Sequence, residues 1–408
     1  MSMLYGDEAM NNNSVASYAF QGLFQNATTI KDASELQIPA TSLNTYCYRN
    51  MFQGCSNLVY PPKTLPAKTV KSYSYYQMFA GCKALVETPE LLATSLGSYC
   101  CQYMFNGCNK LSKVSDLMAK TCQTYCYAYM FQNCKALINP PKIASTKLSN
   151  YCYYYMFYGC TRLVKAPELP ATTLAECCYY NMFQDCTSLV EPPQLPATTL
   201  AGFCYSHMFD GCTSLTEAPE LPATTLASNC YDSMFNNCTS LVEAPQLLAT
   251  ELAYSCYSYM FLNCSKLNKI TMLATDISEK GCLGYWVGGV ASSGTFIKHP
   301  HMKSLPSGSD GIPNGWTVQD YEGEISNLIT FTIDGVEYQA EEGWNWNEWV
   351  NSDYNTCGCY LSGLGETPIF TSNGGNIVVN PLSLSIFEAE MASSEIVNGR
   401  KYFEKFFE

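Results

Sequence analysis

One string, MFxxC, recurs nine times in this chain of 408 residues and constrains its fold more than any other feature. The Met residues of the string stand at positions 51, 78, 104, 130, 156, 182, 208, 234 and 260. The first step is 27 residues long and the other seven are 26 residues long. So strict a period predicts a solenoid, in which each repeat forms one coil that packs against its neighbours.

The fullest repeat reads CYxxMFxxCTSLxxAPxLPATTLA and is matched most closely by residues 204–227. Leu200, Cys204, Met208 and Phe209 are spaced as on one face of a helix, which predicts a short helix with a buried face. A short extended stretch with two prolines follows. We therefore expect an α/β solenoid of about eleven coils, each built from a short helix and a short strand.

Two degenerate copies flank the nine regular repeats. The upstream copy places Ala19, Phe20, Leu23, Phe24, Ala27 and Ile30 in the apolar slots, and the downstream copy places Cys282, Leu283, Trp286, Val287 and Val290 there. Eroded terminal repeats are typical of capping coils. Residues 291–318 are expected to cover the C-terminal end of the solenoid.

The repeat resembles the BspA-like branch of the leucine-rich repeats, whose pattern is roughly AFxxCxxLxxIxIPxxVxxI. Here MF replaces AF, the CxxL step is retained, and LPATTL stands where IPxxV is expected, over residues 18–290. The longer period and an Ala-Pro in place of one aliphatic residue predict shorter strands than in that family. The resemblance implies a leucine-rich-repeat-like, non-enzymatic protein that binds partners at bacterial surfaces.

The sequence divides into an N-terminal tail (1–17), the solenoid (18–318) and a small α+β module (319–408). In the module, alternation at Ile329, Phe331 and Ile333 before Asp334-Gly335 predicts a β-hairpin. A short helix is expected around residues 346–350, further strands at 377–379 and 382–387, and a turn at 398–399. The segment 334–356 resembles a C-terminal module of virion proteins from gut bacteriophages.

Eighteen of the 23 cysteines form two columns, four residues before and four residues after the repeated Met. The columns contain Cys47, Cys100, Cys126, Cys152, Cys178, Cys204, Cys230, Cys256 and Cys282, and Cys55, Cys82, Cys108, Cys134, Cys160, Cys186, Cys212, Cys238 and Cys264. Their spacing and the presence of only 3 His argue against zinc. Disulfides between coils are an alternative, but we expect buried free thiols. Cys357-Gly-Cys359 is interpreted as a turn with two incidental thiols, with a redox-active pair as the alternative.

Charge is divided between two stretches of the solenoid. Residues 48–165 carry 13 basic and 3 acidic residues, whereas residues 166–265 carry 10 acidic residues and no Lys or Arg. A stacked fold converts this asymmetry into a bipolar rod, which would allow two copies to associate into a homo-oligomer. The alternative is that the charges merely solvate the surface, as charge runs usually do.

Tyrosines gather in the first half of the solenoid at two positions, five residues and one residue before the repeated Met. Because these positions are four apart, they would share one helix edge, turned away from the Cys and Met face. The candidate ligand-binding residues are Tyr99, Tyr103, Tyr125, Tyr129, Tyr151 and Tyr155. Tyrosine suits contacts with protein or glycan, although stacking between coils is the alternative role.

Other functions are disfavoured by the sequence. A net charge of −13 argues against nucleic acid, and no run of 18 apolar residues suggests membrane insertion. No nucleophile elbow, phosphate loop or HExxH string is present, so we expect no catalysis, cofactor or metal. The N-terminal residues do not resemble a secretory signal peptide. We therefore expect a phage virion or tail-associated protein that contacts the host surface and is attached to virion proteins by residues 319–408. A bacterial surface adhesin and a cytoplasmic scaffold are the alternatives.

Overall fold

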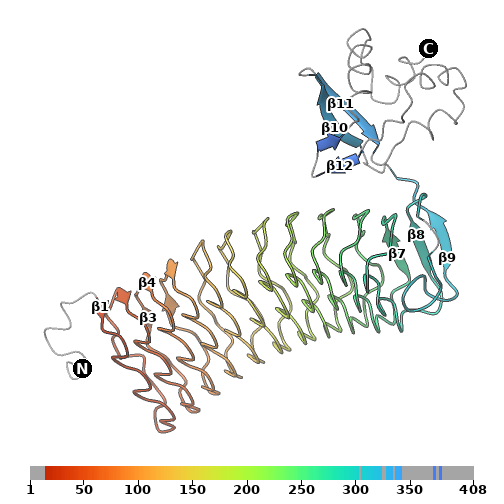
Figure 1. Ribbon diagram of the computed structural model, residues 1–408. Coiled ribbons are helices and arrows are strands. Elements are labelled where there is room, and N and C mark those ends of the chain that lie inside the picture. Colours follow the sequence, from red (N-terminus) through yellow and green to blue (C-terminus); the bar gives the residue numbers. More distant parts are fainter. Residues whose placement is uncertain are drawn as a thin grey trace, which may run out of the picture. The chain divides into compact units, whose positions relative to one another are not determined.

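The computed structural model describes residues 14–302 and 305–323, together with the backbone of four strands between residues 328 and 378. Its contacts divide the chain into two units, Met1–Tyr321 and Glu322–Glu408. The first unit is a β-solenoid of about 12 turns, whose coils lie side by side in chain order (Figure 1).

The strands of the solenoid are short and parallel. One sheet has the order β1-β2-β4-β6 and a second pairs β3 with β5, all strands of two residues. Their bounds are β1 Ser14–Val15, β2 Ser42–Leu43, β3 Thr64–Leu65, β4 Thr69–Val70, β5 Glu90–Leu91 and β6 Ser95–Leu96. Farther along, isolated parallel bridges such as Thr173 with Thr199 continue the same register. The prediction of short strands is thus confirmed.

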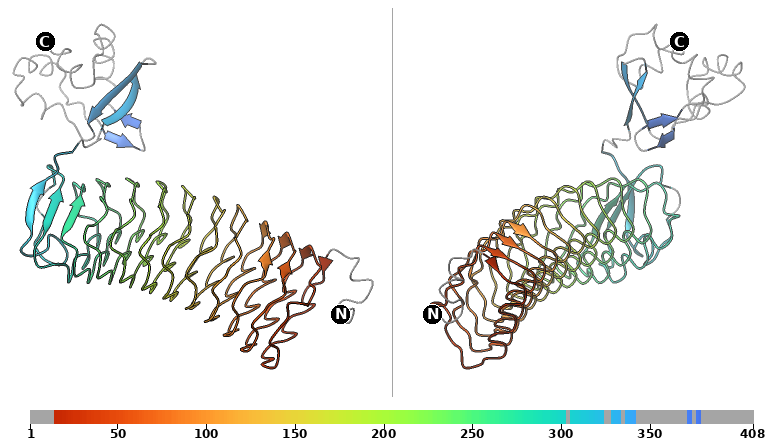
Figure 2. Two further views of the ribbon diagram at one scale, coloured as in Figure 1. Left: turned by 180° about the vertical axis from the view of Figure 1, so that it is seen from behind. Right: turned by 60° about the vertical axis from the view of Figure 1, so that its left-hand side comes forward.

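The solenoid ends in a longer three-stranded parallel sheet, β7 (Lys269–Met272), β8 (Thr295–Lys298) and β9 (Thr317–Asp320). Residues 305–316 cover the degenerate downstream coil that contains Trp286. Trp286 Nε1 donates a hydrogen bond to the Gly311 carbonyl oxygen at 2.9 Å, and Trp316 Nε1 donates one to the Ala291 carbonyl oxygen at 2.8 Å. Both views in Figure 2 show this sheet at the opposite end of the solenoid from β1.

The predicted short helix is wrong, because the described residues contain no helix. The segment around each repeated Met is instead a ribbon of overlapping β-turns, which we call the turn ribbon. In the coil around Met156, the Met156 N–H donates to the Tyr153 carbonyl oxygen at 3.1 Å, and the Tyr158 N–H donates to the Tyr155 carbonyl oxygen at 3.2 Å. Alternate N–H groups donate to the next coil, as Phe157 does to the Met182 carbonyl oxygen at 2.9 Å.

The turn ribbon has a repeat of four residues. Tyr151, Tyr155 and Gly159 have φ values of 59°, 54° and 70°, a left-handed conformation that an α-helix does not contain. A positive φ at the third position of a turn is characteristic of type II. Side chains consequently alternate in pairs, two inward and two outward, so positions four apart share a side, as they nearly do in a helix.

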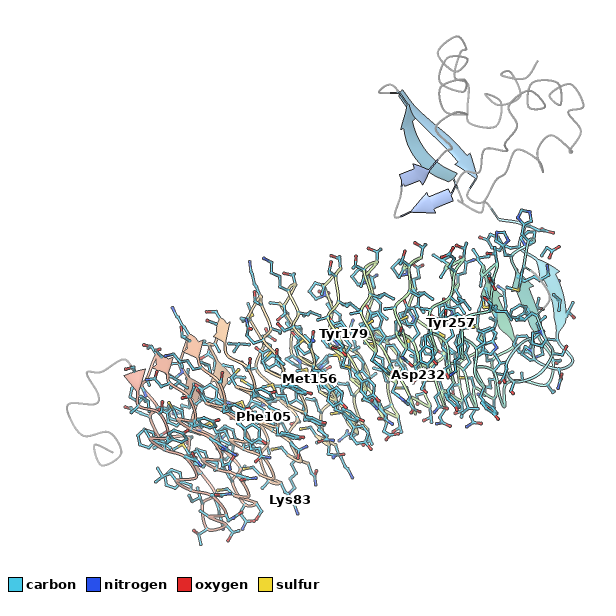
Figure 3. All side chains as sticks on the ribbon, viewed as in Figure 1. Lys83, Phe105, Met156, Tyr179, Asp232 and Tyr257 are labelled. Atoms are coloured by element: carbon cyan, nitrogen blue, oxygen red, sulfur yellow. The ribbon has the colours of Figure 1, made fainter. Side chains whose placement is uncertain are left out.

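The inward pairs form the core of the solenoid. The Phe after each repeated Met stacks on its equivalent in the next coil, for example Phe105 on Phe131 at 5.6 Å between ring centroids. Met156 and Tyr179 are also buried in this core, whereas the side chain of Lys83 points away from it (Figure 3). Because each coil is narrow, its core side chains are buried only when other coils pack on both sides of it.

The second unit is described only by two antiparallel strand pairs. β10 (Leu328–Ile333) pairs with β11 (Val336–Glu341), with Ile333 opposite Val336, which confirms the predicted hairpin. β12 (Thr371–Asn373) pairs with β13 (Asn376–Val378), where a strand was expected at 377–379. The predicted helix at 346–350, the strand at 382–387, the turn at 398–399 and both cysteines at 357 and 359 lie outside the described residues.

Candidate binding surface

The structure brings the six predicted tyrosines together on the outer side of the turn ribbon. They share a surface because outward pairs recur every four residues, not because of a helix edge. The ring centroids of Tyr99 and Tyr125 are 5.1 Å apart, and those of Tyr125 and Tyr151 are 4.6 Å apart. The second column, Tyr103, Tyr129 and Tyr155, stacks at 4.3 and 5.2 Å. All six side chains are half-buried, so we call them the tyrosine face.

The stacked column extends beyond the residues that the sequence singled out. Tyr18, Tyr46 and Tyr73 continue it towards the N-terminal end, at 4.7–4.9 Å between successive rings. Tyr154 was missed altogether, although it lies between the two columns and meets the rings of Tyr125 and Tyr129 edge-on at 6.3 and 5.4 Å. Its position, two residues before the repeated Met, was the signal for an outward side chain.

The stacking determines which part of each ring a partner can contact. Inside a column, both faces of a ring are covered by its neighbours, which leaves ring edges and hydroxyl groups. Burial raises the pKa of Tyr103 and Tyr125, and the neighbouring Cys177 raises the pKa of Tyr151 to about 12. The phenols therefore stay protonated at neutral pH and can both donate and accept hydrogen bonds.

The backbone of the tyrosine face is in an uncommon conformation. All six tyrosines have φ values between 54° and 60°. A left-handed residue with a Cβ costs roughly 1–2 kcal/mol relative to its ordinary conformation. Hydrogen bonds to the next coil and the stacked rings hold these residues in place. The tyrosines are thus part of the solenoid as well as of its surface.

A polar cluster replaces the tyrosines farther along the solenoid. His207 lies between two carboxylates, with Nδ1 at 3.2 Å from Asp210 Oδ2 and Nε2 at 3.6 Å from Asp232 Oδ2. The Asn237 side-chain amide donates to Asp210 Oδ1 at 3.1 Å. Burial raises the pKa of Asp232, while His207 opposes that shift. These contacts connect the coil around Met208 with the coil around Met234.

The two cysteine columns lie inside the coils, as expected. All 21 cysteines among the described residues are free and buried. In the column after the Met, each thiol donates to a Phe carbonyl oxygen of the preceding coil, for example Cys186 Sγ to Phe157 at 3.2 Å. Burial raises the pKa of Cys204 and Cys264 to about 12, so these thiols are protonated and weakly nucleophilic.

The described residues contain no group of three or more His, Cys, Asp or Glu side chains arranged to hold a metal ion. Within the same residues, no helix has the length and apolar character needed to cross a bilayer. The charge asymmetry is the remaining predicted feature. At the boundary between the basic and the acidic stretch, Lys165 Nζ and Glu191 Oε2 form an exposed ion pair at 3.2 Å. Association of two copies through the charged halves stays a prediction.

Comparison with protein-family models, with curated proteins and with solved structures finds no match for this chain. The resemblances to BspA-like repeats and to a phage virion module therefore depend on the residues that carry them. What the geometry adds is a repeat solenoid with an interior of thiol and aromatic columns and one tyrosine-rich outer surface.

Proposed function

We propose that this protein is a non-catalytic recognition rod whose tyrosine face binds a protein or glycan on a cell surface. The observation that carries the proposal is the continuous row of half-buried tyrosines over adjacent coils. Tyrosine is enriched at binding surfaces because its ring and its hydroxyl group contribute apolar contact and hydrogen bonding together. A rigid solenoid presents such groups at fixed spacing and with little loss of side-chain entropy on binding.

We further propose that the rod is carried on a phage particle and attached through residues 319–408. The support is the resemblance of residues 334–356 to a virion module. A bacterial adhesin would use the same surface on a different carrier. Mass spectrometry of particles, envelope and cytosol from the source distinguishes the two. A second protease besides trypsin is needed, because residues 166–265 contain no Lys or Arg. Enrichment in the cytosol alone would contradict both the phage particle and the bacterial surface as carriers, and a cytoplasmic scaffold would be the remaining alternative.

Two triple variants test the tyrosine face. Replacing Tyr99, Tyr125 and Tyr151 with Phe keeps the stacked rings and removes three hydroxyl groups. Replacing the same residues with Ser removes the rings as well, and Ser255 already occupies the equivalent position in another coil with a φ of 48°. We expect both variants to lose binding to source host cells, the Ser variant more completely, while circular dichroism shows that the solenoid persists.

The matched control replaces Tyr60 and Tyr254, which are exposed elsewhere on the solenoid, with Ser. It should bind host cells as the unmodified protein does. If the Phe variant binds normally and the Ser variant loses binding and folding together, the tyrosines are structural and the proposed surface is wrong.

A further inference from the structure

The two ends of the solenoid are not equivalent, because hydrogen bonds between coils run in one direction. Each turn ribbon donates N–H groups to the next coil and accepts from the previous one. In the first coil, Phe20 donates to the Cys47 carbonyl oxygen at 2.8 Å, and Phe24 donates to the Met51 carbonyl oxygen at 2.8 Å. The N-terminal end must therefore finish in backbone acceptors, and the C-terminal end in backbone donors.

Two donors in the middle of the C-terminal end are bonded to the segment that covers it. The Tyr285 N–H donates to Asp310 Oδ1 at 2.7 Å, and the Val287 N–H donates to the Ser309 carbonyl oxygen at 3.3 Å. Trp286 is fully buried under the same segment. This end therefore offers a partner neither these donors nor an open core.

The acceptors at the N-terminal end are not covered by any described residue. No N–H within residues 14–302 and 305–323 donates to the carbonyl oxygens of Ala19, Gln21, Leu23 or Gln25. All four residues are exposed, although their equivalents one coil later, such as Cys47 and Met51, are buried or half-buried. The degenerate upstream copy thus forms the first described coil, and no residue within 14–302 and 305–323 pairs with these acceptors.

Apolar surface accompanies these acceptors. Leu23 occupies the position of the repeated Met and is 45% exposed, against 1% for Met51 in the next coil. A cavity of 510 Å³ in the first two coils is lined by Phe24, Ile30, Leu36 and Phe52 and by the carboxylate residues Asp32 and Glu35, of which Glu35 pairs with Lys63 Nζ at 3.0 Å. Tyr18, which is 59% exposed, is the first ring of the tyrosine column, and only one stacking partner is described for it, Tyr46.

We propose that the N-terminal end of the solenoid is a docking site for a partner polypeptide that lies along the first coil as a further coil would. Its alternate backbone N–H groups would face Ala19, Gln21, Leu23 and Gln25, and an apolar side chain would enter the cavity. Polarity excludes the same end of a second copy, because acceptors would meet acceptors. The C-terminal end of a second copy cannot lie against the first coil as a further coil would, because residues 305–316 already lie over its last coil, where Trp286 is buried and donates to Gly311. The partner is therefore a different chain that provides an N–H edge.

A synthetic peptide with the sequence of residues 122–148 is a suitable probe for the full-length protein under reducing conditions. In the solenoid, the N–H groups of Tyr127 and Phe131 donate to the next coil at 3.0 and 2.9 Å. Its Lys135, Lys142 and Lys147 also complement the Asp32 carboxylate that lines the cavity. We expect saturable binding by fluorescence anisotropy, with a Kd below about 1 mM.

Methylation of backbone nitrogens tests the polarity directly. N-methylation of the peptide at Tyr127 and Phe131 removes two donors and should weaken binding about tenfold or more. N-methylation at Ile138, whose N–H makes no hydrogen bond among the described residues, is the matched control and should change little. Equal binding of all three peptides would overturn the proposal, as would the absence of saturable binding.

Substitutions in the protein locate the site. Leu23→Glu places a charge among acceptors that no described residue pairs with, and it should abolish peptide binding. Val164→Glu changes a residue 39% exposed on the flank and should not. The triple Phe variant of the tyrosine face should bind the peptide normally, so failure here and failure of the proposed function are distinguishable. If Leu23→Glu instead abolishes self-association of the protein, the occupant is a second copy and the proposal is wrong.

Discussion

The inward and outward positions of the turn ribbon are neighbours in sequence, yet the solenoid constrains them differently. Inward positions are almost uniform from coil to coil and hold thiols, Tyr, Met and Phe with almost no exposed surface. Outward positions vary between Tyr, Asn, Ser, Gln and His and are half-exposed. What outward positions share is backbone conformation, since many of them have positive φ. The residues that inward positions accept are therefore limited by side-chain chemistry, and those that outward positions accept are limited by backbone dihedral angles.

The largest expected effect that separates the two sides is alkaline unfolding driven by the inner thiols. Burial raises the pKa of Cys204, Cys256 and Cys264 to about 12, from an ordinary value of 9.0. Between about pH 9 and pH 12 the unfolded chain thus binds fewer protons than the folded one, so the free energy of unfolding falls as pH rises. We expect stability that is insensitive to thiol ionisation below about pH 8.5 and cooperative loss of structure above about pH 10.

Circular dichroism and thiolate absorbance near 240 nm, followed together, check this expectation. Thiolate should form only as structure is lost. If thiolate absorbance rises at about pH 9 while the solenoid is intact, the cysteine columns are accessible to water and are not buried inside the coils.

A charge placed on each side should give the next largest difference. Met208 is fully buried, so Met208→Asp buries a carboxylate without a partner and should lower the free energy of unfolding by about 4 kcal/mol or more. Met118→Asp makes the same change at a residue 52% exposed and should cost less than about 0.5 kcal/mol. Chemical denaturation measures both. A cooperative transition in Met208→Asp identical to that of the unmodified protein would refute the core assignment.

Many features of the inward and outward positions could be predicted from the sequence, and there is a physical reason why the turn ribbon could not be told from a helix. The period, the buried columns and the shared surface of the tyrosines follow from apolar spacing, which is the same for positions four apart in a helix and in the turn ribbon. The distinguishing signal lay three residues after the repeated Met, where only Gly, Asn and Asp occur, as at Gly107, Asn133 and Asp185. Those residues tolerate positive φ, which a helix excludes.

The open N-terminal end could not be predicted in the same way. Phe20, Leu23 and Phe24 fit the apolar slots as well as buried residues do. The apolar pattern of a coil is the same whether or not another coil covers it. The polar cluster at His207 was missed for a related reason. Asp210 lies three residues after His207 in the same coil, but Asp232 belongs to the next coil and meets the imidazole only through stacking.

The outer side can be tested through its backbone alone. Gly107 has a φ of 72°, and a Cβ there would meet no atom closer than 4.0 Å, so Gly107→Ala introduces dihedral strain without a clash. We expect a loss of about 1–2 kcal/mol in the free energy of unfolding. Gly202 lacks a positive φ, and a Cβ there would lie 3.7 Å from the Ser228 carbonyl oxygen, so Gly202→Ala should be neutral or slightly stabilising. Equal losses in the two variants would remove the argument that conformation limits the outward positions.

The smallest expected effect lies within the inner side, where two tyrosines of one column differ in their hydroxyl groups. The Tyr179 hydroxyl is buried and makes no hydrogen bond among the described residues, whereas the Tyr153 hydroxyl accepts one from Cys122 Sγ at 3.1 Å. Tyr179→Phe removes an unpaired polar atom and should raise the free energy of unfolding by about 1 kcal/mol. Tyr153→Phe removes a satisfied one and should lower it by about 0.5–1 kcal/mol. Because both changes keep the stacked rings, opposite signs in denaturant titrations would show that polar satisfaction, beyond apolar packing, determines stability inside the coils. If Tyr179→Phe instead lowers the free energy of unfolding more than Tyr153→Phe does, the Tyr179 hydroxyl has a partner, such as a buried water.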